Sequence, residues 1–108
     1  MTKSISYHSQ LIESLKDSKE AAMYLEVVLE EGDPQMIIKA FLNVIEAREE
    51  LINQSPDFPD RFSKFERKLQ DSGEIEFTLL QSLLNALGLK IGLMVNWRRR
   101  WIYRKKRD

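Results

Sequence analysis

FTLLQSLLNALGL, residues 77–89, is the stretch that decides how the C-terminal half of this chain folds. Its leucines recur at i, i+1, i+4, i+5 and i+8, which is one broad apolar stripe at the helical period. Gly88 follows the stripe, at a point where a helix can end in a left-handed turn without a Cβ penalty. From Leu89 onward, apolar and other side chains begin to alternate. The sequence therefore predicts a helix that ends at Gly88 and is followed by a short strand.

The predicted strand, residues 89–95, needs a partner. A single strand leaves its backbone N–H and C=O groups unpaired, and no other segment of the chain alternates in a comparable way. We expect pairing with the same strand of a second copy, because two-fold dimers are the commonest oligomers. The residues on one face of this dimer strand are Leu89, Ile91, Leu93 and Val95. The alternative is an extended segment packed on its own chain.

Two helices are predicted to meet at a sharp turn in the N-terminal half. Asp17 can cap the first helix, and Gly32 can close it. Asp33 and Pro34 suit the N-cap and the first position of the next helix, where the missing N–H of proline costs nothing. So short a link places the two helices against each other.

Further helices are predicted over 47–54 and 60–70. Pro56 and Pro59 prevent a continuous helix between them, and Pro59 can open the second. The expected fold is mainly α: five short helices and a C-terminal strand within residues 17–95. Residues 1–16 are polar and predict an N-terminal arm, with room for an early helical turn around Leu11, Ile12 and Leu15, and residues 96–108 predict a separate tail.

The charges are divided unevenly along the chain. The 108 residues contain 17 basic and 17 acidic side chains. Residues 1–95 hold 10 basic and 16 acidic residues, 10 − 16 = −6, and residues 96–108 hold 7 and 1, 7 − 1 = +6. An acidic body with a basic tail is informative about binding partners rather than about the fold.

Several functional classes are disfavoured by composition. The chain has no cysteine, so disulfide and thiolate chemistry are excluded. His8 is the one histidine, and neither a metal site nor a positioned catalytic partner is indicated. No apolar run approaches the roughly 20 residues of a membrane span, and no signal-peptide core is seen. We expect a cytoplasmic, non-enzymatic protein without a cofactor, metal or small-molecule substrate.

The layout resembles the addiction-module antidote (antitoxin) proteins with a lambda-repressor-like helix-turn-helix. The resemblance covers roughly residues 17–95 and is carried by Glu20-Ala21-Ala22-x-Tyr24-Leu25, Leu29-Glu30-Glu31-Gly32-Asp33-Pro34, Leu69-x-x-x-Gly73, Phe77-x-x-Leu80 and Leu84-x-Ala86-Leu87-Gly88-Leu89. It implies a helical DNA-binding domain, dimerisation, repression of its own operon and pairing with a ribonuclease-like toxin.

The centre of the chain departs from that family pattern. Residues 51–59 have neither the small residue nor the turn glycine that such a helix-turn-helix usually shows. The region 60–69 corresponds to the recognition helix, and its candidate DNA contacts are Arg61, Ser63, Lys64, Arg67 and Lys68. Basic residues outnumber acidic ones by only one over residues 57–70. A merely solvated helix face is the alternative interpretation.

The tail, residues 96–108, indicates phosphate binding more strongly than residues 60–69 do. Three aromatic residues, Trp97, Trp101 and Tyr103, are interleaved with its cations, which are Arg98, Arg99, Arg100, Arg104, Lys105, Lys106 and Arg107. Such side chains bind phosphates and stack on bases. The alternatives are an unstructured basic tail and a membrane-surface anchor.

Two functional hypotheses follow. The first is a dimeric DNA-binding transcriptional regulator of antitoxin type that represses its own operon and neutralises a toxin. The second is a protein-interaction module with a degenerate helix-turn-helix, whose basic tail binds an acidic protein or RNA. The 55–60 turn discriminates between them, because a tight turn supports the first and a splayed loop the second.

Overall fold

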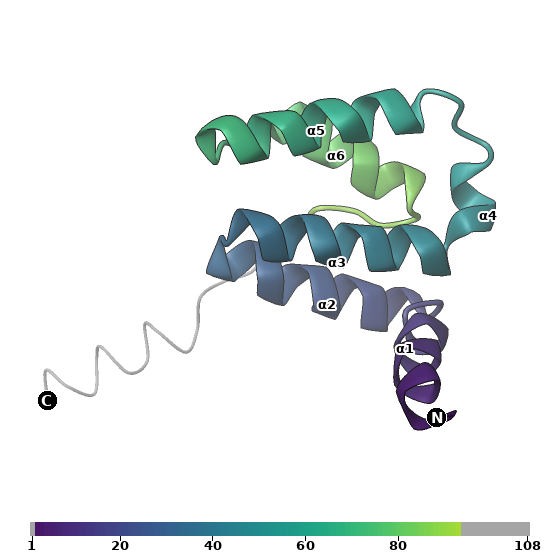
Figure 1. Cartoon of the computed structure of the whole chain (residues 1–108). Coiled ribbons are helices and arrows are strands. Elements are labelled where there is room, and N and C mark those ends of the chain that lie inside the picture. Colours follow the sequence, from purple (N-terminus) through teal and green to yellow (C-terminus); the bar gives the residue numbers. More distant parts are fainter. Residues whose placement is uncertain (1, 94–108) are drawn as a thin grey trace, which may run out of the picture.

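The computed structural model describes residues 2–93, with side chains from Tyr7 onward. This part of the chain is mainly helical, as predicted, and it contains no strand. Figure 1 shows α2 and α3 side by side in one layer, with α5 and α6 in a second layer above them. In chain order the helices of this part are α1 (Thr2–Ser14), α2 (Ser18–Glu31), α3 (Pro34–Ala47), α4 (Glu49–Ile52), α5 (Phe58–Ser72) and α6 (Phe77–Ala86).

The predicted caps of α2 and α3 are confirmed. The Asp17 carboxylate accepts a hydrogen bond from the backbone N–H of Lys19 at 2.8 Å, and Asp33 accepts one from Gln35 at 3.1 Å. Gly32 closes α2 at φ 80°, the left-handed conformation expected there. The two helices form a hairpin, and the Asn43 amide of α3 donates to the Tyr24 hydroxyl of α2 at 2.9 Å.

The segment expected as an N-terminal arm with at most an early helical turn is instead helical over residues 2–14, helix α1. Leu11 is half-buried and Leu15 is buried, and both pack on the core of the body. His8 of α1 lies 3.3 Å from the Glu46 carboxylate of α3. Two leucines one turn apart are a weak sequence signal, and α1 contacts α3 in the folded chain.

The core is built around α3. The ring of Phe41, which is fully buried, lies 5.1 Å between centroids from Phe65 and 6.2 Å from Phe62, both on α5. Phe58 stacks on Phe62 at 6.3 Å and begins α5 two residues before the predicted start. Burying these rings fixes which side of α5 faces inward.

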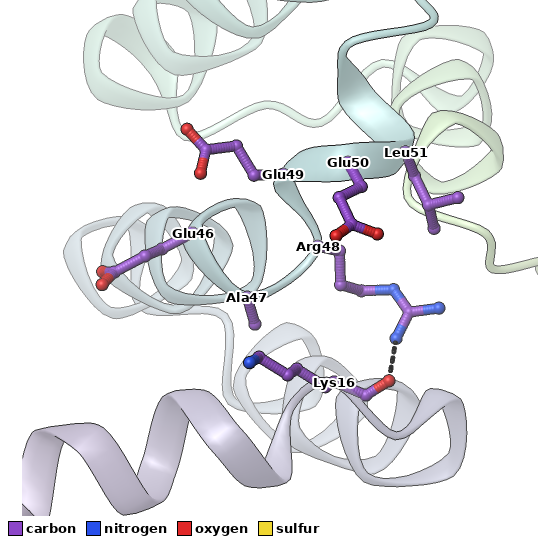
Figure 2. A pocket seen from close by; sticks show the side chains of 7 residues that line it. All are labelled: Lys16, Glu46, Ala47, Arg48, Glu49, Glu50 and Leu51. Carbon is purple, nitrogen blue, oxygen red and sulfur yellow. Dashed lines mark hydrogen bonds between the residues drawn. The ribbon is translucent and has the colours of Figure 1, made fainter.

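Arg48, between α3 and α4, ties three chain segments together. Its Nε donates to the carbonyl oxygen of Leu87, at the end of α6, at 2.7 Å. Its Nη1 donates to the carbonyls of Leu15 and Lys16 at 3.3 and 2.8 Å, and the Lys16 bond is drawn in Figure 2. Its Nη2 donates to the Ser18 hydroxyl at 3.2 Å. One planar guanidinium thus satisfies carbonyls that follow α1 and α6, where no helical donor remains.

The predicted stop after α6 is confirmed, but the predicted strand is not observed in residues 89–93. Gly88 has φ 83°, and the Leu89 N–H donates to the Leu84 carbonyl at 2.8 Å, as in a Schellman motif. Leu89 is buried, and the segment runs on without a regular hydrogen-bond pattern. Of the described residues 89–93, only Leu89 is packed on its own chain as the extended-segment alternative requires, and pairing with a second copy stays a prediction.

Replacing Gly88 with Ala should destabilise the protein more than replacing Gly73 does. Both glycines have positive φ, 83° and 73°, so each variant carries a left-handed penalty of about 1 kcal/mol. A Cβ at Gly88 would lie 3.1 Å from Nη2 of Arg48 and 3.1 Å from Cδ1 of Leu51, whereas at Gly73 no atom lies within 4 Å. Urea unfolding should therefore show an additional loss of roughly 1 kcal/mol for Gly88→Ala, from overpacking. Equal losses for the two variants would contradict this close approach.

Candidate nucleic-acid interface

Helix α5 presents the predicted contact residues on its exposed sides. Pro59 lies in its first turn, and Gly73 ends it at φ 73°. Phe58, Phe65 and Leu69 are buried along one side. All five predicted contact residues are exposed: Arg61, Ser63, Lys64, Arg67 and Lys68. The helix can therefore offer them to a ligand without changing its packing.

The structure divides these residues into two groups. At helical spacing Ser63, Lys64 and Arg67 lie on the side away from the buried phenylalanines, whereas Arg61 and Lys68 lie along the edge next to α6. Asp60 and Asp71 share the outward side. The outward face of α5 is therefore mixed in charge, which weakens its attraction to phosphate.

Arg61 is anchored to α6 beside a polar hollow. Its Nη1 donates to the Ser82 hydroxyl at 2.7 Å, and its Nη2 lies 3.5 Å from the Asp57 carboxylate. The hollow next to it has a volume of about 420 Å³, and its lining contains polar side chains: Ser55, Arg61, Thr78, Gln81, Ser82 and Asn85, together with Ala86. One guanidinium and several neutral donors at a concave surface are a suitable environment for a phosphate oxygen.

Lys68 is engaged with Glu76, which precedes α6. The Lys68 ammonium lies 3.4 Å from the Glu76 carboxylate, and the Thr78 hydroxyl donates to the same carboxylate at 3.1 Å. The Thr78 hydrogen bond first, and then the Lys68 hydrogen bond and charge, lower the pKa of Glu76 below its ordinary value of 4.5. Lys68 would have to give up this partner to contact a phosphate.

The connection between α4 and α5 is not a tight turn. Helix α4 is a single turn, Glu49–Ile52, with no buried residue, and residues 53–57 connect it to α5. Figure 1 shows this connection as a long loop beside α4. A helix-turn-helix usually joins its helices through three or four residues. Pro59 lies in the first turn of α5, in agreement with its predicted role in opening this helix.

The predicted dimer-strand residues are only partly covered. Leu89 is buried, Ile91 is 37% exposed and Leu93 is 100% exposed, and Val95 lies outside the described residues. Within the described part, the backbone of residues 90–93 forms no hydrogen bond. The seven tail cations, from Arg98 to Arg107, also lie outside the described residues.

Sequence reasoning missed two residues that organise this region, Arg48 and Ser82. Arg48 falls at a helix junction, where a cation can reach carbonyl groups, and that position was the available signal. Ser82 gave no signal, because a serine on an exposed helix side is common. Its role depends on how α5 packs on α6.

The described residues were also compared with the requirements of a metal site and of a membrane-spanning helix. No group of three or more histidine, aspartate or glutamate side chains is placed to hold a metal ion within the described residues. Among residues 2–93, every helix is too short or too polar to cross a membrane.

Comparison with known proteins returned no match, whether with protein-family models, curated proteins or solved structures.

The pKa of Glu76 should rise when either of its partners is removed. Because the folded-state pKa is lowered, this carboxylate stabilises the fold above its unfolded pKa, and the contribution is lost as the pH falls through the folded value. Thr78→Val removes the largest single cause and Lys68→Met removes both a hydrogen bond and a charge, so each variant should raise the pKa of Glu76, as followed by NMR titration of the Glu76 carboxyl carbon. Lys39→Met on α3 serves as the control. If the pKa of Glu76 is the same in both variants as in the unmodified protein, the Lys68–Glu76 pair does not form in solution.

Proposed function

We propose that this protein binds nucleic acid without catalysing a reaction, as a DNA-binding regulator of antitoxin type. The observation that carries the proposal is the position of Lys64 and Arg67. Both are exposed on a helix whose other side is anchored by buried phenylalanines, so a partner can reach them. Arg61, beside its polar hollow, extends the same surface toward α6.

Within this surface, the side chains would have different roles. Arg61 and Lys68 lie at the edge and suit contacts to the phosphate backbone, which position a protein but carry no sequence information. Ser63, Lys64 and Arg67 lie outward and suit base edges in the major groove. Asp60 and Asp71 lie nearby and repel phosphate, so α5 alone supplies little affinity.

The basic tail would supply the larger part of the electrostatic affinity. Residues 96–108 carry a net charge of 7 − 1 = +6, whereas residues 1–95 carry 10 − 16 = −6. A chain that approaches DNA through its body alone meets net repulsion. Cations that neutralise DNA phosphates release the counterions bound there, which favours binding. This part of the affinity therefore depends on the tail cations.

Dimerisation is a further part of the proposal. The backbone of residues 90–93 forms no hydrogen bond within the described part, and Leu93 is exposed beside it, so an antiparallel partner strand could add there. A two-fold axis at this segment would give a dimer with two copies of α5, as recognition of a palindromic site requires. Autorepression and neutralisation of a toxin rest on the family resemblance.

The test is a salt titration of binding to the DNA upstream of the protein's own gene. Fluorescence anisotropy should give affinity that falls steeply with salt, with a log–log slope of about −0.9 per phosphate contact. Arg61→Gln with Lys68→Gln should flatten the slope by about two units per subunit, since each lost phosphate contact removes about one. Lys19→Gln with Lys39→Gln, on α2 and α3, removes the same charge and should change the slope little.

Truncation after Val95 separates the tail from the body in the same titration. We expect most of the slope to disappear, whereas an unchanged slope would remove the tail from the DNA interface. If the full chain shows no DNA binding even at low salt, the DNA-binding proposal is contradicted.

A second candidate function is a protein-interaction module, and the geometry near α4 favours it. The single-turn α4 and the loop over residues 53–57 are the splayed arrangement that supports this alternative. In that case the tail would bind an acidic protein or RNA. Co-purification with the product of a neighbouring gene, together with no DNA affinity, would select this function over the first.

A further inference from the structure

The outward side of α2 combines negative charge with exposed apolar side chains. Met23 is 60% exposed and Val27 is 55% exposed, and they lie one turn apart. Four exposed glutamates flank them at helical spacing, and none of these forms an ion pair with another described residue: Glu20, Glu26, Glu30 and Glu31. These six residues form the acidic face of α2. Such a face suits a segment that carries both cations and large apolar groups.

The end of α2 adds to this preference for cations. Its last turn contains no basic residue, so nothing within the helix offsets the negative end of its dipole. Lys19, one full helix length away in the first turn, is the basic residue of α2. A cationic segment lying toward Glu30 would therefore be favoured both by side-chain charge and by the helix itself.

The chain leaves the described part of the structure beside this face. A groove of about 350 Å³ is lined by Leu25, Glu26 and Leu29 of α2 and by the segment from Leu89 to Leu93. Figure 1 shows that this segment turns back from α6 along the layer of α2 and α3. Leu93 is its last described residue and is 100% exposed. Leu93 and Glu26 therefore line the same groove.

We infer that residues 97–107, which carry the cations and aromatic side chains of the tail, dock on the acidic face of α2 of the same chain. Trp97, Trp101 and Tyr103 would cover the Met23–Val27 pair, and the interleaved arginines would pair with the glutamates. The four residues 94–97 can extend about 13 Å. The part of α2 from Met23 to Glu30 is roughly 10 Å long, so a linker of this length lets the tail reach the acidic face. A short linker also gives the tail an effective concentration of about millimolar at this face.

This contact goes beyond the proposed function and does not depend on it. The cations proposed for phosphate binding are the ones that α2 would hold, so docking on α2 and binding of phosphate exclude each other. The acidic body then acts as an internal competitor for its own tail. Nucleic acid, or an acidic protein, would have to displace the tail from α2 before binding it.

The two tryptophans of the protein both lie in the tail, at 97 and 101, so tryptophan emission, excited selectively over tyrosine, reports on the tail alone. The experiment measures the emission maximum and acrylamide quenching of the full chain, without nucleic acid, against a synthetic peptide of residues 94–108. In low salt the full chain should emit at shorter wavelength and be quenched less than the peptide. In about 1 M salt, where the Debye length is about 3 Å, the emission maximum and the quenching of the full chain should become similar to those of the peptide.

Charge-matched variants locate the contact. Glu26→Gln with Glu30→Gln should return quenching toward that of the peptide, because glutamine keeps the helix but removes the charge. Glu49→Gln with Glu50→Gln, on α4, removes the same charge and should leave the tail protected. Quenching of the unmodified chain equal to that of the peptide would overturn the inference, as would protection that survives Glu26→Gln with Glu30→Gln. Protection that increases with protein concentration would mean that a second copy supplies the tail, and would overturn docking within one chain.

Discussion

The guanidinium of Arg48 joins the end of α1, the start of α2 and the end of α6 through one set of hydrogen bonds. Carbonyl groups at helix ends have no donor within their own helix, and leaving such a group buried and unpaired costs about 1–3 kcal/mol. Arginine can satisfy several of them at once because its donors form a rigid planar fork, which a lysine ammonium lacks. Removal of this side chain would therefore affect three junctions together.

The position of Arg48 also determines where the surfaces of the protein lie. By holding the Leu87 carbonyl, it fixes the point at which the chain leaves α6 and starts back along α2. The phenylalanine cluster around Phe41 then orients α5, so that its charged sides face outward. The acidic face of α2 and the outward face of α5, which is mixed in charge, consequently belong to different layers of the same molecule. Leu93, the last described residue before the tail, shares a groove with Glu26 of the acidic face.

The features predicted correctly from the sequence are local ones. Asp17, Asp33 and Gly88 act within a few residues of themselves, through caps and a left-handed turn, so that their roles can be identified without knowledge of the fold. The full length of α1 was not predicted, because its apolar signal is confined to residues 11–15 and the surface on which they pack is distant in sequence. The strand over 89–95 was predicted from alternation alone, yet a strand exists only with a partner, which the sequence of one chain does not supply. For the candidate interface, the sequence identified the cations of α5, but the partners of Arg61 and Lys68 on the α6 side depend on tertiary packing.

Solution NMR of the Arg48 Nε–H group tests the central role of this side chain most directly. With the Nε–H donating to the Leu87 carbonyl at 2.7 Å, the group should exchange with water far more slowly than the Nε–H of the exposed Arg67. A scalar coupling across the hydrogen bond, to the carbonyl carbon of Leu87, should also be detectable. Exchange as fast as that of Arg67, with no such coupling, would contradict the account that Arg48 holds the helix ends together.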